Sequence, residues 1–209
     1  MSLRNRVTPV GEIVATSARG SLMGNRGGCF HRADRTLLDR PFVSHRWIAC
    51  VLEFRGRHRE VMASGRYTEL FFLDEATALA AGHRPCYECR REQANDFARI
   101  WQARTQTTRP PTATEIDATL HTERIDPHSY DKRTHLTDAR SLPDLAFVLH
   151  QDAPAIVWQG ALRKWTAYGY DQTIFPLPQA PVSVLTPATI VAQLAAGYRA
   201  GHHESLAAR

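Results

Sequence analysis

The chain has 209 residues, of which 43% are hydrophobic and 22% are charged, and this is the balance of an ordinary globular protein. This length allows one domain of generous size or two small ones, and no segment approaches the ~18 apolar residues that a membrane span requires. The N-terminus carries charges and no apolar run of the signal-peptide type. We therefore expect a cytoplasmic protein without a membrane partner, in which four cysteines predict metal or redox chemistry rather than disulfides.

The positive charge is concentrated in one part of the chain. The formal net charge is +5, and residues 1–60 hold 11 arginines against 5 acidic residues. A basic segment of this kind favours a polyanion as partner, with nucleic acid as the first candidate. The alternative is charge that serves solubility alone.

Short runs with apolar residues at every second position predict β-strands in the first third of the chain. The first strand leads into residues 17–32, where four glycines and several arginines predict an ordered or ligand-holding loop. The second and third strands flank a Gly-containing turn and predict a hairpin, in which Cys50 lies on an apolar face. The four predicted strands are 9–16, 46–54, 59–64 and 67–73.

Two helices follow. Residues 74–82 predict a short helix, because Asp74 suits the N-cap and Gly82 suits the position after the C-cap. Residues 89–104 predict a longer helix with apolar residues at spacings of three and four. The segment 105–112, with two prolines and four threonines, is the best candidate for a boundary between two parts of the chain.

The second part begins with a helix whose capping box runs from Thr112 to Glu115, and it ends with a helix that starts at Thr186. Strands are predicted between these helices, at 145–150, 154–159, 162–166 and 181–185. The expected fold is therefore α+β. Residues 1–104 form a small antiparallel sheet with a zinc knuckle and helices, and residues 112–209 form a helix plus a small β-meander packed on the first part.

Cys86 and Cys89 lie two residues apart, so that two thiolates can approach one cation from a single turn. A thioredoxin-like redox pair is disfavoured because a helix, not a strand, precedes the pair. Two core thiols are also disfavoured, since Arg84, Glu88 and Arg90 surround them and such side chains do not belong in a core. Zinc takes four ligands, so the pair supplies half of a site.

The pattern around the pair is longer than two cysteines. Aromatic residues end a strand, an alanine-containing helix follows, and Gly-x-Arg-Pro leads into the pair without a gap: Phe71, Phe72, Glu75, Ala80, Ala81, Gly82, Arg84, Pro85, Cys86 and Cys89. This order, over residues 67–91, resembles the zinc-binding N-terminal domain of Ada-type DNA repair proteins. The resemblance implies a structural Zn²⁺ and a surface that meets DNA phosphates. It also implies an upstream cysteine that can accept a methyl group from a damaged phosphate.

The chain departs from this family upstream, where the family's Cys-x3-Cys pair is missing. Cys29 and His31 lie two residues apart in the glycine-rich loop and can turn to one ion, which gives a Cys3His set suited to zinc. Cys50 is the substitute for either of them, although its apolar face favours a core thiol. With fewer thiolates, methyl transfer does not simply carry over. The upstream candidates are Cys29, His31, His45, Cys50 and His58. The expected ligands are Cys86 and Cys89 together with Cys29 and His31 from this upstream set.

Arginines gather around the Cys pair and the glycine-rich loop. Together with the N-terminus of the following helix they favour phosphate, so the sequence predicts contact with DNA or RNA backbone. The alternative for each arginine is an ordinary solvated face. The predicted nucleic-acid-binding residues are Arg26, Arg32, Arg84, Arg90 and Arg91.

Residues 116–135 form a second cluster, dense in acids, bases and histidines. Asp117 and His121 stand four apart on the predicted helix and can pair, and His128 and His135 follow in a loop. The cluster leaves open an enzyme, either a phosphodiester hydrolase or a methyl-group acceptor. It matches no H-E-x-x-H or P-loop spacing, and a capped helix with a solvated loop also explains it. A third alternative is a zinc-stabilised protein-interaction module.

Overall fold

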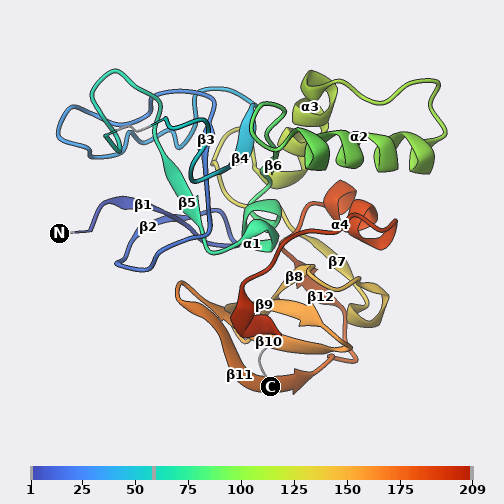
Figure 1. Cartoon of the computed structure of the whole chain (residues 1–209). Coiled ribbons are helices and arrows are strands. Elements are labelled where there is room, and N and C mark those ends of the chain that lie inside the picture. The colour runs from blue at the N-terminus through green and yellow to red at the C-terminus, as the bar shows by residue number, and fades with distance from the viewer. Residues whose placement is uncertain (1, 58–59, 208–209) are drawn as a thin grey trace.

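The protein has an α+β fold. The computed structural model describes residues 2–57 and 60–207, and Figure 1 shows them as two sheets with helices between and above. Each sheet has six strands within these described ranges. No helix found in them is long and apolar enough to span a bilayer.

The first sheet belongs to the N-terminal part and has the strand order β2-β1-β5-β3-β4-β6. It is mixed: β1 pairs with β5 and β4 pairs with β6 in parallel, and the other neighbours are antiparallel. Its strands are β1 (Arg4–Val7), β2 (Ile13–Ala15), β3 (Leu22–Arg26), β4 (Trp47–Val51), β5 (Leu70–Phe72) and β6 (Arg84–Pro85).

The segment expected as a glycine-rich loop instead supplies a central strand of this sheet, β3. Gly24 permits the strand because a Cβ there would lie 2.1 Å from the carbonyl oxygen of Ile48 and 2.8 Å from the Phe72 ring. β4 therefore pairs with β3 and not with residues 60–64. The expected hairpin is wrong: residues 60–64 form turns and coil, and Arg59 lies outside the described residues.

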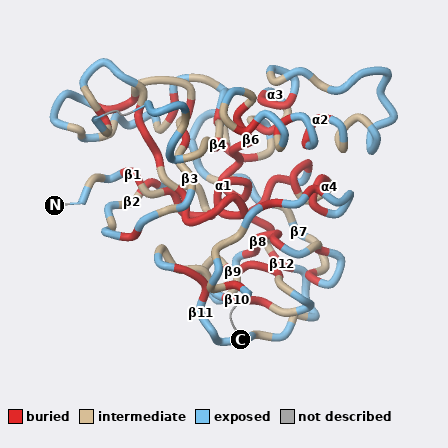
Figure 2. Tube along the Cα trace, in the orientation of Figure 1, coloured by how far each residue is buried: buried red, intermediate tan, exposed pale blue. Residues whose placement is uncertain are grey.

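Polar side-chain caps begin two of the four helices of the described residues, α1 and α3, at the positions that the sequence predicted. Asp74 accepts a hydrogen bond from the backbone N–H of Thr77, and Thr112 and Glu115 make both bonds of the predicted capping box. All six residues of the first helix are buried, and Figure 2 shows it as a continuous buried segment in the middle of the molecule. The helices are α1 (Glu75–Ala80), α2 (Arg91–Thr105), α3 (Ala113–Arg124) and α4 (Ala188–Ala195).

The second sheet is antiparallel with the order β11-β10-β9-β8-β12-β7, so the expected meander is present and extended. Two of its strands, β7 and β11, were not predicted, because β7 has only three residues and β11 has a run of four exposed residues without apolar alternation. Its strands are β7 (His135–Thr137), β8 (Phe147–His150), β9 (Ala153–Trp158), β10 (Ala161–Thr166), β11 (Gly169–Pro176) and β12 (Val182–Val184).

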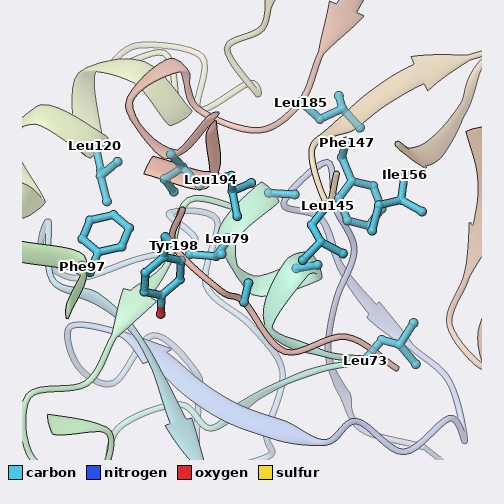
Figure 3. Close-up of a cluster of buried hydrophobic side chains, with 14 of the residues drawn as sticks. Leu73, Leu79, Phe97, Leu120, Leu145, Phe147, Ile156, Leu185, Leu194 and Tyr198 are labelled. Atoms are coloured by element: carbon cyan, nitrogen blue, oxygen red, sulfur yellow. The ribbon is translucent and has the colours of Figure 1, made fainter. Parts of the chain in front are cut away.

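One hydrophobic core crosses the segment 105–112. Leu79 and Phe97 from the first part pack in the same cluster as Phe147 and Tyr198 from the second (Figure 3). Polar contacts cross as well, since the Tyr170 hydroxyl donates to the Asp74 carboxylate at 2.7 Å. The two parts expected from the sequence therefore share their interior.

Candidate metal centre

Three cysteines, one on a strand and two at the ends of one turn, converge beside the first sheet. Cys50 lies on β4, Cys86 follows β6, and Cys89 precedes α2, with their three sulfur atoms within 4.8 Å of one another. The parallel pairing of β4 with β6 causes this approach, because the backbone N–H of Cys86 donates to the carbonyl oxygen of Ala49, the neighbour of Cys50, at 3.0 Å.

The turn between Cys86 and Cys89 points donors at one sulfur. The backbone N–H of Glu88 donates to the Cys86 sulfur at 3.4 Å, and hydrogen bonds from the Cys50 and Cys89 thiols hold the pKa of Cys86 far below its usual range. The same contacts and burial raise the pKa of Cys50, and the pKa of Cys89 is also raised. A soft divalent cation bound at the three sulfurs would take the place of thiol protons.

The cluster opens onto a cavity of about 500 Å³ whose lining includes all three cysteines. Glu69 also lines the cavity; one of its carboxylate oxygens accepts from the backbone N–H of Met62, and the other is buried without a hydrogen-bond partner. At the rim, Arg57 forms an ion pair of 2.7 Å with Glu88, which ties the chain after β4 to the turn between the cysteines.

Cys29 and His31 lie together but outside this cluster. Their side chains are 3.7 Å apart, and the His31 ring also binds Thr68 Oγ1 at 2.7 Å and the carbonyl oxygen of Ala63 at 3.3 Å. These bonds fasten the segment after β3 to residues 63–68. The structure therefore brings Cys50, the substitute, to Cys86 and Cys89, and does not bring the expected Cys29 and His31 there.

Two further histidines were upstream candidates. His45 stacks on His121 with ring centroids 3.7 Å apart, and it is not part of the cysteine cluster. His58 lies outside the described residues.

The direction in which the residues of β4 face explains why the sequence predicts Cys50 only as a substitute ligand. Trp47 and Ala49 are the buried residues of this strand, so its core-facing side is the opposite of the one expected from the sequence. Cys50 and Ile48 therefore face the cavity. Cys50 could be predicted as a ligand only if β6 were known to pair with β4 in parallel. β6 has two residues, which is too short for any periodic pattern to predict it as a strand.

The arginines expected on an exposed surface are mostly buried, which corrects that interpretation. Arg84 binds both carboxylate oxygens of Asp117 at 2.9 and 2.8 Å, and Arg90 pairs with Glu75 at 2.6 Å. Arg26 is 1% exposed. Buried guanidiniums with internal partners cannot follow a nucleic-acid backbone. Arg32 and Arg91 are exposed, and their contact with nucleic acid stays a prediction.

The histidine-rich segment 116–135 does not assemble as expected. Asp117 is held by Arg84 and does not pair with His121, whose ring instead accepts from Arg124 at 3.1 Å. Burial, with help from Arg124 and His45, lowers the pKa of His121 to about 4. His128 lies exposed in a turn and His135 on β7, and among the described residues of this segment no three groups come close enough to share a metal ion.

Comparisons with protein-family models, with curated proteins and with solved structures gave no match. The resemblance to the Ada-type zinc domain therefore rests on residues 67–91 alone and stays a prediction.

Proposed function

We propose that this chain is a zinc protein in which the thiolates of Cys50, Cys86 and Cys89 bind Zn²⁺. The observation that carries the proposal is the mutual approach of their sulfurs within 4.8 Å. A tetrahedral ion with Zn–S bonds of ~2.3 Å needs sulfurs about 3.8 Å apart, so a small contraction of the cluster suffices.

The donor set supports zinc over harder cations. Thiolates select Zn²⁺, Cu⁺ or iron–sulfur clusters, whereas Mg²⁺ and Ca²⁺ take oxygen ligands. Three sulfurs around a single point match a mononuclear ion.

The ion would join β4, the turn after β6 and the start of α2, which are already connected by the pairing of β4 with β6 and by the ion pair of Arg57 with Glu88. Cys50 and Cys86 stand 36 positions apart in the chain, so the metal closes a loop that contains β5 and α1. Binding to the folded cluster and not to the unfolded chain stabilises the fold by linkage.

Metal content of the purified protein tests the proposal. We expect one equivalent of zinc, with sulfur scattering from three ligands in X-ray absorption at the zinc edge. Cys50→Ser and Cys86→Ser should each lose most of this zinc. Cys29→Ser is the matched control, because Cys29 is also a half-buried free thiol, and it should keep the full complement. A fully loaded Cys50→Ser protein would refute the ligand set.

A second candidate function is a metal centre that admits an exchangeable ligand. Within the described chain no fourth His, Cys, Asp or Glu joins the three cysteines. The cavity in front of them holds the unpartnered oxygen of Glu69, an arrangement typical of sites that bind a water or a small molecule at the metal. Cobalt-substituted protein tests this candidate, because added imidazole or thiol should change its visible spectrum. An unchanged spectrum would show that the fourth position is closed.

A further inference from the structure

A second cavity lies on the other face of the first sheet. Its volume is about 800 Å³, and its lining includes Arg26, Trp47, Arg124 and Lys132. The metal-side cavity is lined instead by Asn25 and by other residues that alternate with these along β3 and β4. Because successive side chains of a strand point to opposite faces, the two cavities are separated by the sheet itself.

Three cationic side chains wall this second cavity at close quarters. Arg26 and Arg124 are each 1% exposed, and their guanidiniums stack on the two-ring system of Trp47 at 3.9 and 4.1 Å from its centroid. The ammonium of Lys132 donates to the carbonyl oxygen of Ala80. Burial lowers the pKa of Lys132 to about 7, and the charges of Arg26 and Arg124 contribute to this shift. The three cations are therefore near enough to repel one another.

The hydrogen-bond partners of these cations carry no negative charge. Arg26 donates to the carbonyl oxygen of Gly11 at 2.8 Å and to the His83 ring at 3.4 Å. Arg124 donates to the carbonyl oxygens of Gly82 and His45 at 2.8 and 2.6 Å. One donor is left over, because the Arg124 Nε atom is buried and has no hydrogen-bond partner.

Carboxylates do not neutralise them either. None of the ion pairs in the described part of the chain includes Arg26, Arg124 or Lys132. Asp117 acts on Arg124 from a distance, but both of its oxygens are bound by Arg84. The acidic residues of the lining are exposed: Glu12, Asp39 and Asp131.

Buried like charges without a counter-charge are costly, and proteins retain such groups where a charged ligand completes the site. We propose that the cavity walled by Arg26, Arg124 and Lys132 binds a phosphate-bearing small molecule, with its phosphoryl group against the three cations. A phosphate monoester carries about −1.5 to −2 charges at neutral pH, which suits three cations better than the single charge of a carboxylate.

The rest of the cavity favours a metabolite-sized ligand. A volume of about 800 Å³ lies within the range of small-molecule pockets, and the lining also includes apolar side chains such as Ile13, Leu37 and Ile125. A nucleic acid is disfavoured, because Arg26 and Arg124 are too deeply buried to reach an extended backbone. The site uses none of the proposed metal ligands, so it stands or falls independently of the zinc proposal.

The lysines give a direct test, because Lys132 and Lys164 are the two lysines of the whole chain. Selective ¹³Cε-lysine labelling of the purified full-length protein then yields two NMR signals whose titrations report the two ammonium groups. In chloride buffer, we expect Lys132 to titrate near pH 7. Inorganic phosphate or pyrophosphate should raise its pKa by about 1 to 3 units, because a bound anion favours the charged ammonium. The exposed Lys164 should not respond.

Matched variants give the second measurement. Lys132→Met should abolish the rise in melting temperature that pyrophosphate produces, whereas Lys164→Met should keep it. The proposal is overturned if phosphate and pyrophosphate move the Lys132 signal no more than the Lys164 signal. It is also overturned if sodium acetate at equal ionic strength has the same effect, or if duplex DNA alone shifts Lys132. The NMR titration of Lys132 in the wild-type protein tests the proposal even if Lys132→Met fails to fold.

Discussion

Glu75 binds partners from both parts of the chain at once. Its carboxylate pairs with Arg90 at 2.6 Å and accepts from the Tyr198 hydroxyl at 2.7 Å and from the backbone N–H of Gly201 at 2.9 Å. Because the pair with Arg90 is buried, neutralising one member leaves the other as an uncompensated charge.

Glu75→Gln should therefore lower the free energy of unfolding by about 3 to 5 kcal/mol, as measured by urea denaturation. Asp96→Asn is the matched control, since Asp96 pairs with Arg99 while both side chains are more than 60% exposed. Its cost should stay below about 1 kcal/mol. Equal losses of unfolding free energy in the two variants would contradict the claim that burial makes the Glu75–Arg90 pair more important than the exposed pair.

Single residues also show how far the sequence predicts the candidate metal centre. The spacing of Cys86 and Cys89 is enough to predict that their sulfurs lie close together, because a two-residue spacing fixes their distance locally. The third member, Cys50, is brought in by a strand pairing between distant segments. The burial of Arg26 and Arg84 could not be predicted either, because an arginine is expected at the surface unless its buried partner is known.

At the scale of elements, the best predictions came from local chemistry. The caps at Asp74 and Thr112 predicted the starts of α1 and α3, and the short runs at 145–150, 154–159 and 162–166 predicted β8, β9 and β10. The strand β3 was missed because its glycines suggested a loop, whereas the close approach of its neighbours is what requires Gly24.

Gly24→Ala should consequently disrupt the pairing of β3 with β4 and with β5. The added methyl group would overlap the carbonyl oxygen of Ile48, which is backbone and cannot move alone. We expect a loss of at least about 2 kcal/mol, in the range of overpacking and backbone shifts. Thermal unfolding followed by circular dichroism measures it, and a melting temperature equal to that of the wild type would contradict the close packing of these strands.

At the scale of the whole molecule, α1 is the shared centre. Its buried residues contact the first sheet on one side, and the cluster around Leu79, Phe147 and Tyr198 on the other. Trp165 on β10 adds a hydrogen bond of 3.1 Å to Thr77 within α1. The two parts expected from the sequence are thus bound by a common interior and not by a linker alone.

The full chain should therefore unfold in one cooperative transition, and residues 1–104 expressed alone should not fold. Fluorescence, which reports tryptophans in both parts, and near-ultraviolet circular dichroism should give coincident unfolding curves. An isolated 1–104 fragment with dispersed amide NMR signals in the presence of zinc would contradict this prediction.

The alternation along β4 has a consequence for how the chain reaches its native state. If β4 paired one position out of register, Cys50 would turn toward the core and Trp47 would turn toward the thiol pair. Such a misaligned chain would offer two sulfurs instead of three and would hold a metal ion weakly. If the three cysteines bind a metal ion as proposed, binding of the ion would therefore favour the chain in which β4 is correctly aligned, and the supply of the ion would affect how much of this sheet assembles correctly.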